Sequence, residues 1–149
     1  MITIDLIHSA VNFHAAIKVA VSSIKAHRPE YDWVGVYLYN GKALSLQDDH
    51  YLGAAANETE IPLSAGICGA AATARKTIVV DDVSHDDRYI PCSLTVQSEI
   101  VVPILSGDTL VGVLDLDSDK PAAFEAGDRA YLEYAAAELA AAWANENSR

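Results

Sequence analysis

The stretch EIVVPILSGDTLVGVLDLDS (99–118) decides the fold class, because it places a tight-turn signal between two apolar, β-branched segments. Residues 99–105 and 109–116 are rich in Val, Ile and Leu, which favour strands. Ser106-Gly107-Asp108 supplies the small and polar residues of a hairpin turn. The stretch therefore predicts an antiparallel β-hairpin.

A second hairpin is predicted upstream. Residues 31–39 (YDWVGVYLY) are aromatic and β-branched, Asn40-Gly41 is the strongest short signal for a hairpin turn, and residues 42–51 supply the returning strand. Between the hairpins the sequence predicts four further segments: a short strand at 60–63, an Ala-rich helix at 66–75, a strand at 77–80 and a long polar loop at 81–98.

Two helices are expected at the ends of the chain. Apolar side chains recur at helical spacing in residues 5–27 and 127–145, and Arg28-Pro29 stops the first pattern. Adjacent hairpins imply an antiparallel sheet, and amphipathic helices need an apolar surface to cover. We therefore expect an α+β fold in which the terminal helices pack together on one face of the sheet. The short helix and the loops form a pocket on the other face.

The composition restricts the classes of partner. Ten Lys and Arg stand against 21 Asp and Glu, which gives a net charge of −11 without any basic tract. Neither nucleic acid nor an anionic membrane is therefore expected as a partner. The longest uncharged segment, 61–74, is too short to span a bilayer. Two cysteines are too few for a disulfide scaffold, and the N-terminus lacks a signal-peptide pattern, so we expect one cytoplasmic domain over residues 1–149.

The two cysteines occupy different surroundings. Cys68 lies in Gly66-Ile67-Cys68-Gly69, at the predicted start of the short helix, where unpaired backbone N–H groups favour a thiolate. A free cysteine is most often a small buried apolar residue. Cys92 fits that description poorly, because it follows Pro91 in the long polar loop.

Three carboxylates interrupt the strands of the last hairpin. Asp115 and Asp117 are two residues apart on one strand, so they share a face, and Glu99 opens the other strand at the same end of the sheet. Acids at strand ends are usually solvated, but Val113-Leu114-Asp115-Leu116-Asp117 places two of them within an apolar run. Clustered carboxylates bind an amine or a metal, or share a proton.

Trp33, Tyr37 and Tyr39 alternate along the first predicted strand and therefore lie on one face. Such a stripe is typical of a core, and Trp and Tyr also form walls for small cationic or thioether ligands. The five histidines show no metal-ligand spacing, and neither cysteine has a CxxC partner. The sequence therefore predicts no metal site and no cofactor.

Four motifs together resemble free methionine-(R)-sulfoxide reductase, a single-domain enzyme family with the GAF fold. They are WVGVYLY (33–39), IPLSAGICGAAA (61–72), YIPCSLTVQSEIVVPI (89–104) and GVLDLDS (112–118). Many sensor domains share the separate pieces. A combination of two features is more specific: Cys92 lies seven residues before Glu99, the glutamate of SEIVVP, and the motif GVLDLDS follows downstream.

The resemblance implies a role for each candidate residue. Cys92 matches the catalytic cysteine, which attacks the sulfoxide sulfur and becomes a sulfenic acid. Cys68 matches a second cysteine of the family. It can condense with the sulfenic acid if the Cα atoms of the two cysteines come within about 7 Å. Glu99 matches a glutamate that lines the site, and because Asp115 and Asp117 crowd its carboxyl we expect it to be the acid that protonates the sulfoxide oxygen. The remaining matches are residues that bind the substrate: Trp33, Tyr37, Glu99, Asp115 and Asp117.

The family also implies partners: free methionine sulfoxide, a thioredoxin-type reductant and a second copy of the chain in a homodimer. Members typically carry a third, resolving cysteine ten residues before the Cys68 position, where this sequence has Glu58. A non-enzymatic GAF module that binds a small molecule, or a redox-sensing cysteine pair, is therefore the alternative to the reductase.

Overall fold

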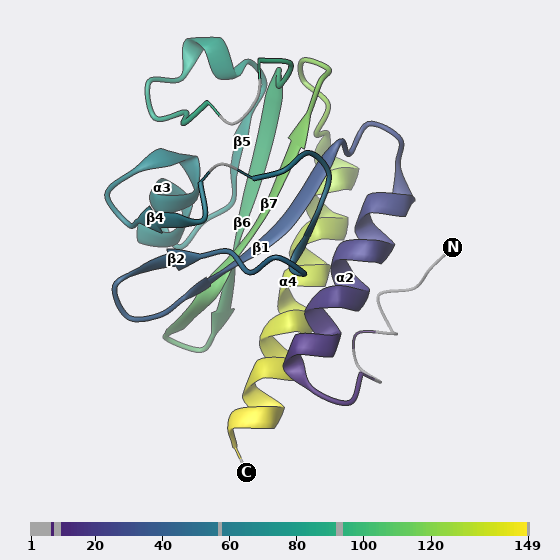
Figure 1. Ribbon diagram of the computed structural model, residues 1–149, viewed down its shortest axis with the longest axis vertical. Coiled ribbons are helices and arrows are strands. Elements are labelled where there is room, and N and C mark those ends of the chain that lie inside the picture. The colour runs from purple at the N-terminus through teal and green to yellow at the C-terminus, as the bar shows by residue number, and fades with distance from the viewer. Residues whose placement is uncertain (1–6, 8–9, 57, 92–93, 149) are drawn as a thin grey trace.

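The computed structural model describes residue 7 and residues 10–56, 58–91 and 94–148. All strand pairs in its sheet are antiparallel, in the order β4-β2-β1-β7-β6-β5, with the short strand β3 also paired to β1. The α+β fold expected from the two hairpins is confirmed. Figure 1 shows the sheet with two long helices on one side and a short helix on the other.

The last hairpin forms the middle of the sheet. It consists of β6 (Ser98–Ser106) and β7 (Thr109–Ser118), each slightly longer than the predicted strand. Their register runs from Ser98 opposite Ser118 to Ser106 opposite Thr109. Gly107 turns the chain at φ +57°, a left-handed conformation that glycine adopts without steric cost. On its outer side β6 pairs with β5 (Ile78–Val80).

The first hairpin differs from its prediction. β1 (Trp33–Tyr39) turns at Asn40-Gly41 into β2 (Ala43–Ser45), which pairs in turn with β4 (Glu60–Pro62). The expected continuous return strand at 42–51 is wrong. The chain leaves β2 at residue 46, forms a turn, and rejoins β1 only as β3 (Tyr51–Leu52).

Hydrogen bonds explain this interruption. The N–H of Leu46 donates to the carbonyl of Thr59, and the N–H of His50 donates to the carbonyl of Gln47, which closes a turn. The N–H of Val36 then donates to the carbonyl of His50, so the chain is held against β1 again.

The helix α2 (Phe13–His27) begins later than the periodicity predicts. Residues 10–12 are not helical, and the side chain of Asn12 caps the helix by accepting a hydrogen bond from the N–H of Ala15. The helix ends before Arg28-Pro29, as expected, because the residue before a proline disfavours the helical conformation. The predicted helical residues before position 7 lie outside the described residues.

The helix α4 (Ala126–Asn147) packs beside α2 on the same face of the sheet (Figure 1). Buried apolar side chains from both helices and from alternate strand positions form this core, among them Ile17, Ile24, Leu114, Leu132 and Leu139. Asp128 at the start of α4 accepts hydrogen bonds from the guanidinium of Arg28 and the hydroxyl of Tyr31, which fixes the end of α2 against it. No helix in the described ranges combines the length and apolarity needed to cross a membrane.

The helix α3 (Gly66–Ala74) lies on the opposite face of the sheet, beside β4 (Figure 1). A second apolar cluster forms there, and it includes Tyr37, Ile67, Cys68, Val101 and Val113. A short 3₁₀ turn, η1 (Val83–His85), follows β5. The expected arrangement of terminal helices on one face and short helix with loops on the other is therefore confirmed.

Candidate active site

Four of the predicted site residues lie on the α3 side of the sheet, in two neighbouring rows. Trp33, Asp117 and Glu99 are directly opposite one another on β1, β7 and β6. In the next row Asp115 stands between Gly35 and Val101. Directly opposed residues point to the same face, so three carboxyl groups meet in the middle of the sheet.

Cys68 of α3 covers these carboxyls. One ligand-type atom from each of Cys68, Glu99 and Asp115 lies within 4.8 Å of the others. The thiol of Cys68 donates a hydrogen bond to Asp115, and a hydrogen bond also joins Asp115 to Glu99. A hydrogen bond between two carboxyl groups requires a proton on one of them. All three residues are buried.

Burial controls the ionisation of this cluster. It raises the pKa of Asp115, which the hydrogen bonds from Glu99 and Cys68 partly oppose. Burial, and then the charges of Asp115 and Glu99, raise the pKa of the Cys68 thiol well above its usual range. The expectation that a helix N-terminus makes Cys68 a thiolate is therefore wrong for this conformation. Desolvation and nearby negative charge outweigh the partial charge of a short helix.

An aromatic wall stands beside the carboxylates. The ring of Trp33 lies over the backbone of Gly35, where a Cβ atom would come within 2.3 Å of the indole. Trp33 also stacks on Tyr51 of β3, with ring centroids 5.4 Å apart, and its indole N–H donates to the carbonyl of Ala54. Gly35 is thus needed for the position of Trp33. The sequence already indicates this position, because Gly35 is the one small residue within the aromatic strand WVGVYLY.

Two cavities divide the predicted residues. A small one of about 30 Å³ is lined by Tyr37, Cys68, Glu99 and Asp115. It has room for about one water molecule. Glu58, which occupies the position of the family's third cysteine, also lines it, and its carbonyl accepts a hydrogen bond from the Tyr37 hydroxyl.

The second cavity has a volume of about 190 Å³ and is lined by Trp33 and Asp117 together with residues that the sequence analysis did not select. These additional lining residues are Asp32, Ala54, Ala55, Thr95, Val96 and Asp119. The two halves of the predicted site thus lie side by side, since Asp115 and Asp117 are only two residues apart on β7. Nothing in their sequence pattern marked Ala54 or Ala55 as cavity residues.

Cys92 lies outside the described residues. The segments on either side of it reach the two cavities: Ile90 lines the small one, and Thr95 and Val96 line the larger one. Ile90 also packs against Gly66 at the start of α3, where a Cβ would meet its Cδ1 at 2.8 Å. Gly66 has φ +71° and faces this contact, so both the backbone conformation and the packing require glycine there.

A family model described as the GAF domain matches residues 13–143, almost the whole described chain. The chain belongs to the GAF domain family. This GAF domain is 39% identical over 100 residues to GAF domain-containing protein A of Dictyostelium discoideum, a match that covers 67% of this chain and 62% of that protein. The four motifs resemble free methionine-(R)-sulfoxide reductase, and this resemblance is confirmed because the relatives of the chain include proteins named free methionine-R-sulfoxide reductase.

One of these is the Escherichia coli protein of that name, 32% identical over 108 residues, with 72% of this chain and 64% of that protein covered. Among solved structures, the free methionine-R-sulfoxide reductase of Neisseria meningitidis in complex with its substrate has a TM-score of 0.90 at 31% identity, and the match covers 97% of this chain and 86% of that one. The matches cover just under two thirds of the length of the Dictyostelium discoideum and Escherichia coli proteins.

Proposed function

We propose that this GAF domain reduces free L-methionine-(R)-sulfoxide with thiols. The observation that carries the proposal is the buried cluster of Cys68, Glu99 and Asp115 beside the aromatic wall, since it combines a thiol with neighbouring carboxyls, and burial raises the pKa of Asp115. The relatives named for this activity, one of them solved with its substrate, support it.

The two cavities suggest how a small zwitterion binds. Asp117 and Trp33 both line the larger cavity, and they suit an ammonium group and an apolar or thioether chain respectively. In the proposal the methyl sulfoxide points toward Tyr37, Glu99 and Asp115. The small cavity must widen to admit the sulfoxide, and movement of the chain near Ile90 is the simplest way to achieve this.

The proposed chemistry assigns bond formation to Cys92. Its thiolate attacks the sulfoxide sulfur and forms an S–S bond, while a proton from Glu99 goes to the sulfoxide oxygen; the hydroxyl then moves to the cysteine sulfur as the S–O and S–S bonds break. The oxygen ends on Cys92 as a sulfenic acid, and methionine is released. The sulfur of the substrate is reduced by two electrons, and the cysteine sulfur is oxidised by two.

Cys68 is the proposed resolving thiol. Its proton lies in a hydrogen bond to Asp115, so this carboxylate can accept it as the sulfur attacks the sulfenic acid. The products are a Cys68–Cys92 disulfide and water, and a thioredoxin-type dithiol then reduces the disulfide. We further propose that residues 1–149 act as one domain and that the terminal helices pair two copies in a homodimer.

The decisive experiment measures turnover of free methionine-(R)-sulfoxide with dithiothreitol, with the (S)-epimer as the control substrate. Cys92→Ser should abolish turnover. Cys68→Ser should retain a single reductive turnover and lose most of the thioredoxin-dependent rate. Turnover that survives Cys92→Ser would contradict the mechanism. Tight binding of methionine sulfoxide without any turnover would instead assign the chain to non-catalytic GAF modules.

A further inference from the structure

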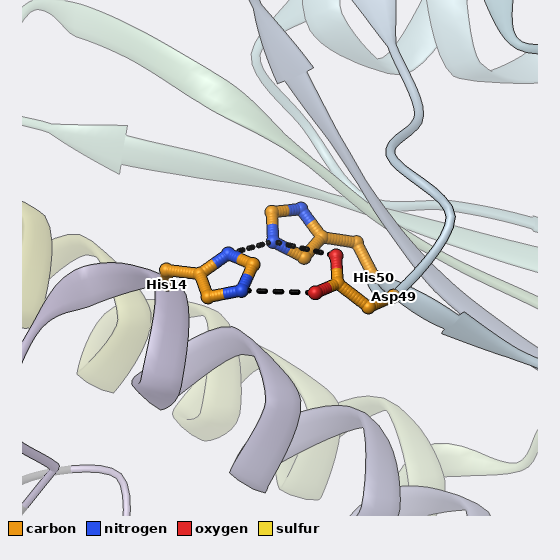
Figure 2. A group of neighbouring side chains, drawn as sticks. All are labelled: His14, Asp49 and His50. Atoms are coloured by element: carbon orange, nitrogen blue, oxygen red, sulfur yellow. Dashed lines mark hydrogen bonds and ion pairs between the residues drawn. The ribbon is translucent and has the colours of Figure 1, made fainter.

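His14 meets the adjacent residues Asp49 and His50 on the α2 face of the sheet, the face opposite α3 and the proposed site. His14 lies in the first turn of α2, whereas Asp49 and His50 lie in the turn between β2 and β3. Figure 2 shows the three side chains pointing toward one another across the gap between helix and sheet. One ligand-type atom from each lies within 4.8 Å of the other two.

The distances among these groups are short. Nε2 of His50 is 2.7 Å from Nδ1 of His14, and Nε2 of His14 is 3.0 Å from Oδ2 of Asp49. The second oxygen, Oδ1, is 3.9 Å from Nε2 of His50. The first distance requires one proton between two ring nitrogens. An ion that displaced this proton would leave the lone pairs of both nitrogens facing the same small region of space.

The cluster combines a fixed ligand with accessible ones. His50 is 1% exposed, and its carbonyl is held by the N–H of Val36, so its ring is anchored to the sheet. The side chains of His14 and Asp49 are each about half exposed, at 47% and 48%, which leaves an approach for an ion. Burial and the neighbouring His14 lower the pKa of His50, which keeps its ring neutral.

We propose that His14, Asp49 and His50 bind a divalent transition-metal ion of the zinc class. Bonds of about 2.0–2.1 Å in a tetrahedral site separate the ligand atoms by roughly 3.3 Å, so Nδ1 of His14 and Nε2 of His50 need to move apart by well under 1 Å. The Asp49 carboxylate contacts the other nitrogen of His14, Nε2, and must turn so that Oδ1, 3.9 Å from His50, reaches the ion. Two imidazoles and one carboxylate suit zinc, cobalt or nickel rather than magnesium or calcium, and water completes the fourth position.

The surrounding charge favours a cation. The chain carries a net charge of −11, and Asp48 is adjacent to the proposed ligand Asp49. Lys18, one helical turn after His14, opposes this because its charge disfavours another cation near His50. A bound ion would join the start of α2 to the sheet. Because the unfolded chain lacks this arrangement, the ion would stabilise the folded protein.

The test uses the untagged full chain. Equilibrium dialysis against Zn²⁺ should give one ion bound per chain, and Co²⁺ should give the visible absorption bands of a low-coordinate site. His14→Ala and Asp49→Ala change exposed side chains, so folding should be retained, and each should weaken Zn²⁺ binding by roughly 100-fold or more, because even outer-shell changes typically cost 10–100-fold. His50→Gln should do the same in a protein shown to be folded by circular dichroism.

Two control variants identify the site. His85→Ala removes a histidine whose exposed pair with Asp82 offers only two ligands, and it should leave Zn²⁺ binding unchanged. Cys68→Ser removes the thiol of the other group of potential ligands, Cys68, Glu99 and Asp115, and should also leave it unchanged. Zn²⁺ binding that is lost in Cys68→Ser but kept in His14→Ala and Asp49→Ala would overturn the proposal. So would a wild-type protein that takes up no Zn²⁺.

Discussion

The thiol of Cys68 donates a hydrogen bond to the buried carboxyl group of Asp115. This contact joins α3 to the central strand β7 and keeps the thiol protonated, because the carboxyls around it and its own burial raise its pKa. Cys68 is thus held unreactive until its neighbours change.

Asp115→Asn should lower the pKa of Cys68, because the substitution removes a negative charge and replaces the carboxylate that accepts the thiol's hydrogen bond with a weaker, neutral amide acceptor. The measurement is thiolate absorbance at 240 nm against pH, in a Cys92→Ser background that leaves one thiol. Iodoacetamide at neutral pH should also modify Cys68 faster in Asp115→Asn. An unchanged titration curve would show that burial alone sets the thiol's pKa.

Asp117→Asn should lower kcat/KM for free methionine sulfoxide by about 10–100-fold, because a hydrogen bond to a charged group contributes about 1.5–3 kcal/mol. The matched substrate is the analogue without the amino group. If Asp117 binds the ammonium, its loss should have little effect on the analogue. A similar drop for both substrates would assign Asp117 to the shape of the site instead.

Gly35→Ala should displace the Trp33 ring, because the added methyl group would lie 2.3 Å from it. Overpacking of this kind costs about 1–3 kcal/mol, which denaturant unfolding with fluorescence detection would measure. The matched control is Gly127→Ala in α4, where a Cβ meets nothing within 4 Å. That variant should be neutral or stabilised by up to about 1 kcal/mol through helix propensity.

Asp128→Asn should destabilise the protein at neutral pH by about 1–3 kcal/mol, because it weakens buried hydrogen bonds to Arg28 and Tyr31. Burial alone would raise the pKa of Asp128, but hydrogen bonds from Tyr31, from the backbone of Glu125 and from Arg28 lower it. A lowered pKa means that the unfolded chain binds the proton first as the pH falls. The stabilisation is therefore present above about pH 4 and is lost below it.

Urea midpoints of wild type and Asp128→Asn should accordingly differ at pH 7 and converge as the pH falls through the Asp128 pKa. Asp82→Asn is the control, since Asp82 also has a lowered pKa, from Ser84 and His85, but its side chain is half exposed to solvent. Its midpoint should stay close to wild type at both pH values. A constant difference between wild type and Asp128→Asn would contradict the linkage.

Local sequence signals are sufficient to predict the central hairpin and the shared face of Asp115 and Asp117. Turn residues at 106–108 and the two-residue period of a strand locate Asp115 and Asp117 on one face without any tertiary information. The sequence pattern places the start of α2 too early, because apolar periodicity continues through residues 10–12, whereas the Asn12 side chain caps the helix and α2 begins at Phe13. The sequence predicts one continuous strand over residues 42–51, because the turn at Gln47–His50 contains no glycine or proline.

The remaining features depend on contacts between distant segments. The environment of Cys68 follows from the docking of α3 onto the carboxylates of β6 and β7, and burial then outweighs the local helix effect. The cluster of His14 and His50 depends on how α2 packs on the sheet, so no spacing rule could reveal it. The division of the site into two cavities likewise depends on residues 54–55 and 95–96, whose sequence carries no chemical signal.

The two-residue strand β3 gives the molecule an internal optical reporter. Alternation along a strand directs Tyr51 to the face where it stacks on Trp33, while His50, one peptide bond earlier, is directed to the helix side. Indole emission is sensitive to such stacking, and the other tryptophan, Trp143, lies far along α4. A change in Trp33 fluorescence would therefore register events on either side of the sheet, without any added label.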